Sequence, residues 1–146
     1  MSGFHHAFGA VTILVNALAG VLGGLAWLLR RRVPGFWPLL RVGQALILVE
    51  AVTGAALVLD GKDLPRLHLI YGLVPIAVAF LGEQLRLLSA SQVLEQRGLE
   101  GSADVAKLPE DEQHALVDEI VRRETGTMAA SALVVMLLAL RAQGWL

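Results

Sequence analysis

Four apolar stretches, each about as long as a bilayer is thick, constrain this chain more than any other feature. A helix needs about 20 mostly apolar residues to cross the hydrocarbon core of a membrane. Such stretches are predicted at 7–29, 36–59, 67–88 and 125–140. Only 17% of the residues are charged, which is low for a water-soluble domain. The sequence therefore predicts an all-α fold, an integral membrane four-helix up-and-down bundle, with residues 1–146 forming a single transmembrane domain.

The segment between the third and fourth spans, residues 89–124, is the hydrophilic part of the chain. Pro109 and the three acids that follow it are typical of a helix start, because proline suits the first turn and acids suit the positive end of the helix dipole. Apolar residues from Leu116 to Val121 then share one face. We expect an amphipathic cytoplasmic helix that lies on the membrane surface or runs straight into the fourth span. We interpret it as a solvated connector, with a docking site for a partner as the alternative.

The distribution of basic residues predicts the orientation of the spans. Nine of the twelve Lys and Arg residues fall on the side of the long loop, and three fall on the side of the termini. Basic residues are enriched in the cytoplasmic loops of membrane proteins. We therefore expect a multi-pass protein of the cell membrane with both termini outside and the loop 89–124 in the cytoplasm.

Glu50 is an acid in the middle of the second span. Counted at about 1.5 Å per residue from the end of its helix, it lies near the bilayer midplane. The same kind of count places Asn16 and Ser131 at a similar depth. A carboxylate there is costly unless it is paired, protonated or hydrated. We expect Glu50 to be protonated or hydrogen-bonded to Asn16 or Ser131, either as a proton or ion relay or as a satisfied core acid.

Two further patterns concern the packing of the helices. Glu83 and Arg86 lie in the last turns of the third span, and with Arg123 or its neighbour Arg122 opposite they predict an ion pair at the inner end of the bundle. Gly20 and Gly24, spaced four apart, are typical of close helix contacts in membranes. That contact would lie inside the bundle or between two copies of the chain.

Three histidines are predicted to lie at one level, near the outer surface. His5 and His6 open the first span, and His68 opens the third. Helices one and three lie on a diagonal of an up-and-down bundle, so these imidazoles would face each other across the core. Two axial histidines are a known way to hold haem b, with Tyr71 as a supporting group. Copper or zinc, held by the same three histidines, is the other option.

In outline, the four spans and the histidines that open the first and third of them resemble small four-helix b-type cytochromes. The sequence lacks the several paired histidines of the di-haem members, so the resemblance implies at most one haem.

Three functions follow from these patterns. The first is electron transfer through a haem b or metal bound at the outer side. The second is a non-catalytic accessory or assembly subunit of a larger membrane complex, and the third is a small proton- or ion-coupled transport subunit that uses Glu50. The sequence has no cysteine and no recognisable catalytic motif, so we do not expect an enzyme on its own. The expected partners are the lipid bilayer and a membrane protein complex or further copies of the chain, and no nucleic acid.

Overall fold

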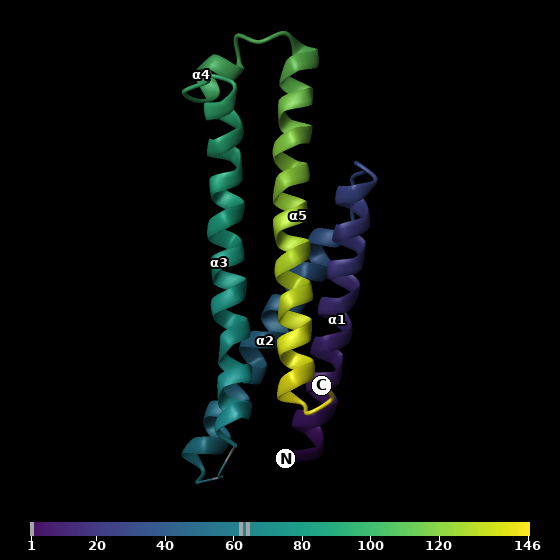
Figure 1. Ribbon diagram of the computed structural model, residues 1–146, viewed down its shortest axis with the longest axis vertical. Helices are drawn as coiled ribbons and strands as arrows, with labels where there is room; N and C mark the ends of the chain where they lie inside the picture. The colour runs from purple at the N-terminus through teal and green to yellow at the C-terminus, as the bar shows by residue number, and fades with distance from the viewer. Residues whose placement is uncertain (1, 62, 64) are drawn as a thin grey trace.

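The computed structural model describes residues 2–61, 63 and 65–146, with side chains described from His6 onward. The described residues form helices and no strand (Figure 1). The helices are α1 (Ser2–Leu28), α2 (Phe36–Leu59), α3 (Arg66–Gln96), α4 (Ser102–Val105) and α5 (Glu110–Ala142). By length and composition, α1, α2, α3 and α5 can each cross a membrane. The predicted fold class is confirmed, and the chain has the architecture of a multi-pass membrane protein.

The four long helices pack as an antiparallel bundle around α5. This helix packs along both α1 and α3, whereas α2 packs on α1 and less closely on α3 (Figure 1). α1 and α3 therefore lie on a diagonal, as the up-and-down order predicts. Both termini lie at the end of the bundle where α2 turns into α3. We call this the terminal end, and the opposite end the hairpin end.

The hairpin end takes its name from α3 and α5, which extend well beyond α1 and are joined through α4 (Figure 1). The predicted amphipathic segment is the first part of α5 and continues directly into the fourth span. No proline follows Pro109 in α5, so nothing breaks the helix before the membrane. Side-chain hydrogen bonds help to join α3 to α5 in the hairpin: Arg97 donates to Glu119 at 2.7 Å, and Arg123 donates to Gln96 at 2.9 Å.

Glycine and alanine bring α1 close to its neighbours. Gly20 lies against Leu133 of α5, and Gly23 lies between Phe36 of α2 and Ala129 of α5. Small residues at these positions let helix backbones approach, which is how membrane helices gain packing energy. The buried core beside them consists of Ala19, Phe36, Leu40, Met128, Ala129 and Ala132.

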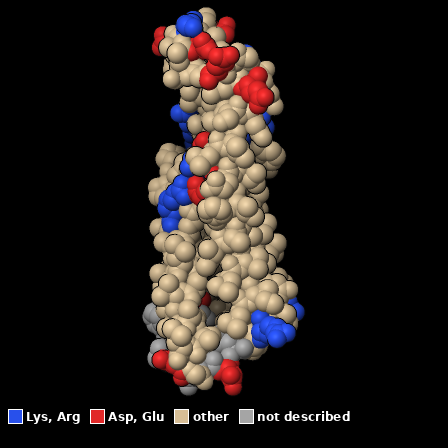
Figure 2. Space-filling model, turned by 90° about the vertical axis from the view of Figure 1, so that its left-hand side faces the viewer, with Lys and Arg blue, Asp and Glu red and all other residues tan. Residues whose placement is uncertain are grey.

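The outer surface of the bundle is apolar, as a lipid-facing surface must be. Leu59 is 87% exposed, and large apolar side chains such as Leu14 and Phe80 are more than half exposed. The face shown in Figure 2 has a long uncharged stretch, with Lys, Arg, Asp and Glu gathered towards both ends and at one patch on its edge. This pattern matches an apolar band that lipid covers, between two charged ends in water.

Candidate functional site

A cavity of about 370 Å³ lies at the terminal end of the bundle, between α2 and α3. Residues from α1 and from the end of α5 complete its wall. The lining is mostly apolar, and its polar side chains are those of Thr12, Glu50, His68, Tyr71 and Gln143. Sites for small molecules and cofactors have this character, with volumes of about 300–1,000 Å³ and a few polar groups in an apolar wall.

The cavity forms where glycines on α2 and α3 leave the space between the two helices unfilled. Gly54 of α2 and Gly72 of α3 both line it, and a Cβ added at either position would meet no atom within 4 Å. Pro75 lines the same wall. It has no N–H, so the carbonyl of Tyr71 loses its usual helical donor. These residues leave space and backbone polarity inside an apolar region.

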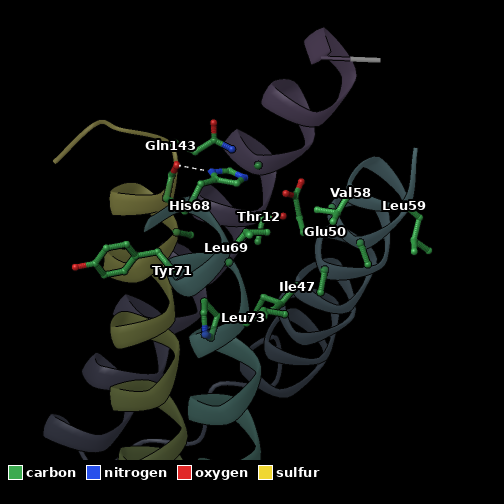
Figure 3. A pocket seen from close by; sticks show the side chains of 18 residues that line it. Thr12, Ile47, Glu50, Val58, Leu59, His68, Leu69, Tyr71, Leu73 and Gln143 are labelled. Atoms are coloured by element: carbon green, nitrogen blue, oxygen red, sulfur yellow. Dashed lines mark hydrogen bonds between the residues drawn. The ribbon is translucent and has the colours of Figure 1, made fainter. Parts of the chain in front are cut away.

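His68 is half-buried at the first turn of α3. Its Nδ1 lies 2.9 Å from the backbone carbonyl oxygen of Ala142, at the end of α5. A carbonyl can only accept, so Nδ1 carries the proton that is donated. In the neutral imidazole, Nε2 is then the nitrogen with a lone pair. In Figure 3 this second ring nitrogen lies on the side of the ring towards Glu50.

His6 is anchored to the same end of α5. Its Nδ1 lies 2.8 Å from Oε1 of Gln143, and the Gln143 amide packs against Gly9 of α1. The structure therefore brings His6 and His68 to one level, each bonded to a residue that follows Leu140. Gln143 was not among the predicted site residues, because the fourth span was expected to end before it. The side chain of His5 lies outside the described residues.

Glu50 projects from α2 into the cavity that His68 also faces (Figure 3). Its Oε1 atom is buried. Across from Glu50 on α1 lies Thr12, whose hydroxyl donates to the carbonyl oxygen of Phe8 at 3.1 Å. Glu50 is therefore a wall residue of the cavity that His68 also lines.

The structure does not bring Glu50 together with Asn16 and Ser131. The Asn16 side chain is buried against Gly43, two turns along α2 from Glu50, and its Nδ2 donates to the Thr12 carbonyl at 2.9 Å. Ser131 faces the α3 backbone instead, 3.4 Å from the carbonyl oxygen of Val78. Counting depth from the helix ends misplaced Asn16, because α1 is shifted along α2 and places Thr12 at the level of the cavity.

The predicted ion pair at the other half of the bundle is present only in part. Glu83 accepts from Arg86 at 2.9 Å and also from Arg41 of α2. Arg123 is not part of this cluster. It pairs instead with Glu119 at 3.0 Å, one turn earlier on its own helix. The sequence feature that could have found this pair is Arg41 itself, a cation inside the second span, because such a cation needs an acid on a neighbouring helix.

Tyr71 lies beside Arg141. The guanidinium of Arg141 lies 5.7 Å from the Tyr71 ring centre, and the hydroxyl of Tyr71 points away from Glu50 and His68 (Figure 3). Among the described residues, no group of three or more His, Cys, Asp or Glu side chains is placed to hold a metal ion. Ligation of haem, copper or zinc by His5, His6 and His68 stays a prediction.

Comparison of the chain with protein-family models, with curated proteins and with solved structures finds no match.

Proposed function

We propose that this protein binds a small lipid-soluble molecule in the cavity between α2 and α3. The supporting observation is one apolar cavity of about 370 Å³ whose wall holds both His68 and Glu50. An apolar wall favours a ligand that partitions into the bilayer, and polar groups within it fix the orientation of the ligand. The protein would act as a binding or carrier module of the membrane.

The hydrogen bonds of the site indicate the polar group that the ligand carries. The Nδ1–H of His68 donates to the carbonyl oxygen of Ala142, so Nε2 is the acceptor when the ring is neutral. The carboxylate of Glu50 also accepts when it is ionised. A ligand with an apolar body and a hydroxyl or amine donor can hydrogen-bond to these acceptors.

Haem or metal ligation by His68 is a second candidate, supported by the same hydrogen bond. Histidines that ligate metals usually donate their other ring N–H to a carbonyl or carboxylate, which fixes the ring and the tautomer. The bond from His68 to Ala142 has this form. His5 or His6 would supply the second axial ligand of a haem b, and the protein would then carry electrons.

Replacing His68 by alanine is expected to reduce the amount of bound molecule about three- to tenfold, because one hydrogen bond to the ligand is lost. The measurement is mass spectrometry of organic extracts, with an absorption spectrum and elemental analysis, on protein purified from its own membranes. His114→Ala is the matched control, since His114 is exposed on α5 far from the cavity.

Each outcome of this comparison decides between the candidates. An organic molecule retained by the wild type and by His114→Ala, but depleted in His68→Ala, supports the lipid-soluble ligand. A Soret band, or bound copper or zinc, that disappears in His68→Ala supports the second candidate. A wild-type protein that carries none of these contradicts both.

We also propose that the hairpin end faces the cytoplasm and that the termini face outward across the cell membrane. The excess of Lys and Arg at the hairpin end supports this orientation. The chain has no cysteine, so single cysteines can report it. Asp60→Cys should react with a membrane-impermeant thiol reagent in intact cells, and Ser102→Cys only after permeabilisation. The reverse labelling pattern would contradict the orientation.

A further inference from the structure

A second hollow, of about 940 Å³, lies at the hairpin end of the bundle, far from the cavity just described. It is formed by the end of α1, the connection from α1 to α2, and the face of α5 opposite them. Its lining is strongly basic and partly aromatic: Arg30, Arg31, Arg32 and Arg122, with Trp27, Phe36 and Trp37.

The acids in this hollow are already paired with arginines, one of them Arg32 of the hollow itself. Asp118 pairs with Arg32, and Glu119 pairs with Arg97 and Arg123. Within the described part of the chain, the guanidinium groups of Arg30 and Arg31 form no ion pair. The hollow therefore offers positive charge that the protein itself does not neutralise.

Arg30 has a strained backbone conformation at the end of α1. The amide of Arg31 donates to the carbonyl oxygen of Ala26 at 3.0 Å, which closes the end of α1 in the manner of a Schellman motif. This motif places Arg30 in the left-handed region, with φ of 51°, where glycine is the usual residue. Among the described residues, Arg30 is the only one other than glycine with a positive φ. Backbone strain of this kind concentrates at functional sites, which makes Arg30 a candidate for ligand binding.

Arg122 is fixed on the opposite wall by Trp27. Its guanidinium lies 5.7 Å from the Trp27 ring centre, and its Nε donates to the Trp27 carbonyl oxygen at 3.2 Å. Tryptophan is enriched where the apolar core of a bilayer meets its headgroups. We therefore expect the arginines of the hollow at the depth of lipid phosphates.

An apolar surface leads away from the hollow along α1. Leu25, Leu28 and Leu29 are 47%, 65% and 64% exposed, and they lie just before the arginines. A lipid whose headgroup occupied the hollow would lay its acyl chains along these side chains. A free phosphate ion would use only the arginines.

We propose that this hollow binds the phosphate headgroup of an anionic phospholipid from the leaflet at the hairpin end. Arginine binds phosphate through parallel N–H···O bonds, and basic pockets between membrane helices are suited to anionic headgroups. Arg30 and Arg31 supply the charge, Arg122 closes the far wall, and the leucines of α1 hold the acyl chains. This site is independent of the ligand cavity at the terminal end.

Lipid titration of the full-length protein in a neutral detergent, followed by native mass spectrometry, tests this proposal. Phosphatidylglycerol should bind more tightly than phosphatidylcholine. Arg30→Gly and Arg31→Gln should each weaken phosphatidylglycerol binding about fivefold, the effect of one interfacial basic residue. Arg30→Gly also relieves the strained backbone, so it keeps the fold. Lys107→Gln removes one charge from the same end but outside the hollow, and should change the affinity less than twofold.

Two further results would overturn the proposal. The first is equal binding of phosphatidylglycerol by the wild type, Arg30→Gly and Arg31→Gln. The second is binding of inorganic phosphate in place of the lipid. If the site binds a lipid, inorganic phosphate at the same concentration should neither compete with phosphatidylglycerol nor raise the melting temperature of the protein. Competition by inorganic phosphate that is lost in Arg31→Gln would assign the hollow to a free anion instead of a lipid.

Discussion

Replacing Gly23 by alanine is expected to destabilise the bundle by about 1–3 kcal/mol, the usual cost of forcing an extra carbon into a packed core. A Cβ at Gly23 would lie 2.8 Å from Cδ2 of Phe36 and 2.9 Å from the Ala129 Cβ. Both neighbours belong to the buried core where α1, α2 and α5 meet, so neither has room to withdraw. The measurement is the free energy of unfolding in detergent micelles by denaturant titration.

Gly24→Ala is the matched control, because it adds the same methyl group at the next position of the same helix. A Cβ at Gly24 would meet nothing within 4 Å, so we expect a change below about 0.5 kcal/mol, as at surface sites without a special role. Equal destabilisation by the two substitutions would contradict the packing of α1 described above. It would indicate that Gly24 also lies in a helix contact, for example with a second copy of the chain.

Replacing Gly72 by leucine is expected to abolish ligand binding, with at least a tenfold loss of bound molecule, while the melting temperature stays close to that of the wild type. Gly72 lines the cavity, and open space surrounds the position of its missing Cβ. A leucine there occupies volume that the ligand needs and adds apolar contacts in place of the ligand's own. Filling a cavity with an apolar side chain is neutral or stabilising when no neighbour must move.

Gly24→Leu serves as the control for the added side chain. It introduces the same residue on α1, outside the cavity and with open space around it. It should retain the ligand at the wild-type level. Loss of the ligand in both leucine variants would show that the added side chain acts through the fold, and not by filling the cavity.

The four spans could be read from the sequence because the signals that define them are local. The second predicted span, 36–59, coincides with α2, and the glycine and proline residues around it mark both ends. α3 and α5 extend past their apolar parts into the hairpin, where charged residues continue each helix in water. Apolar length sets where a helix crosses the membrane, but not where the helix itself ends.

The candidate site could be predicted only in part because it depends on how the helices are shifted along one another. Glu50 and His68 stood out by residue type, and both line the cavity. The neighbours of Glu50 could not be derived in the same way, because α1 is shifted along α2. This shift places Thr12, and not Asn16, at the cavity. Gln143 lies beyond the apolar part of α5, and its bond to His6 and its place in the cavity wall identify it. Such contacts join residues that are more than a hundred positions apart, and no local pattern reports them.

Native mass spectrometry of the protein ejected directly from its own membranes tests the central claim most directly. The wild type and Gly24→Leu should carry one additional organic mass, and Gly72→Leu should lack it. The same mass on Gly72→Leu, or a wild-type protein with no bound organic molecule, would contradict a ligand in the cavity between α2 and α3.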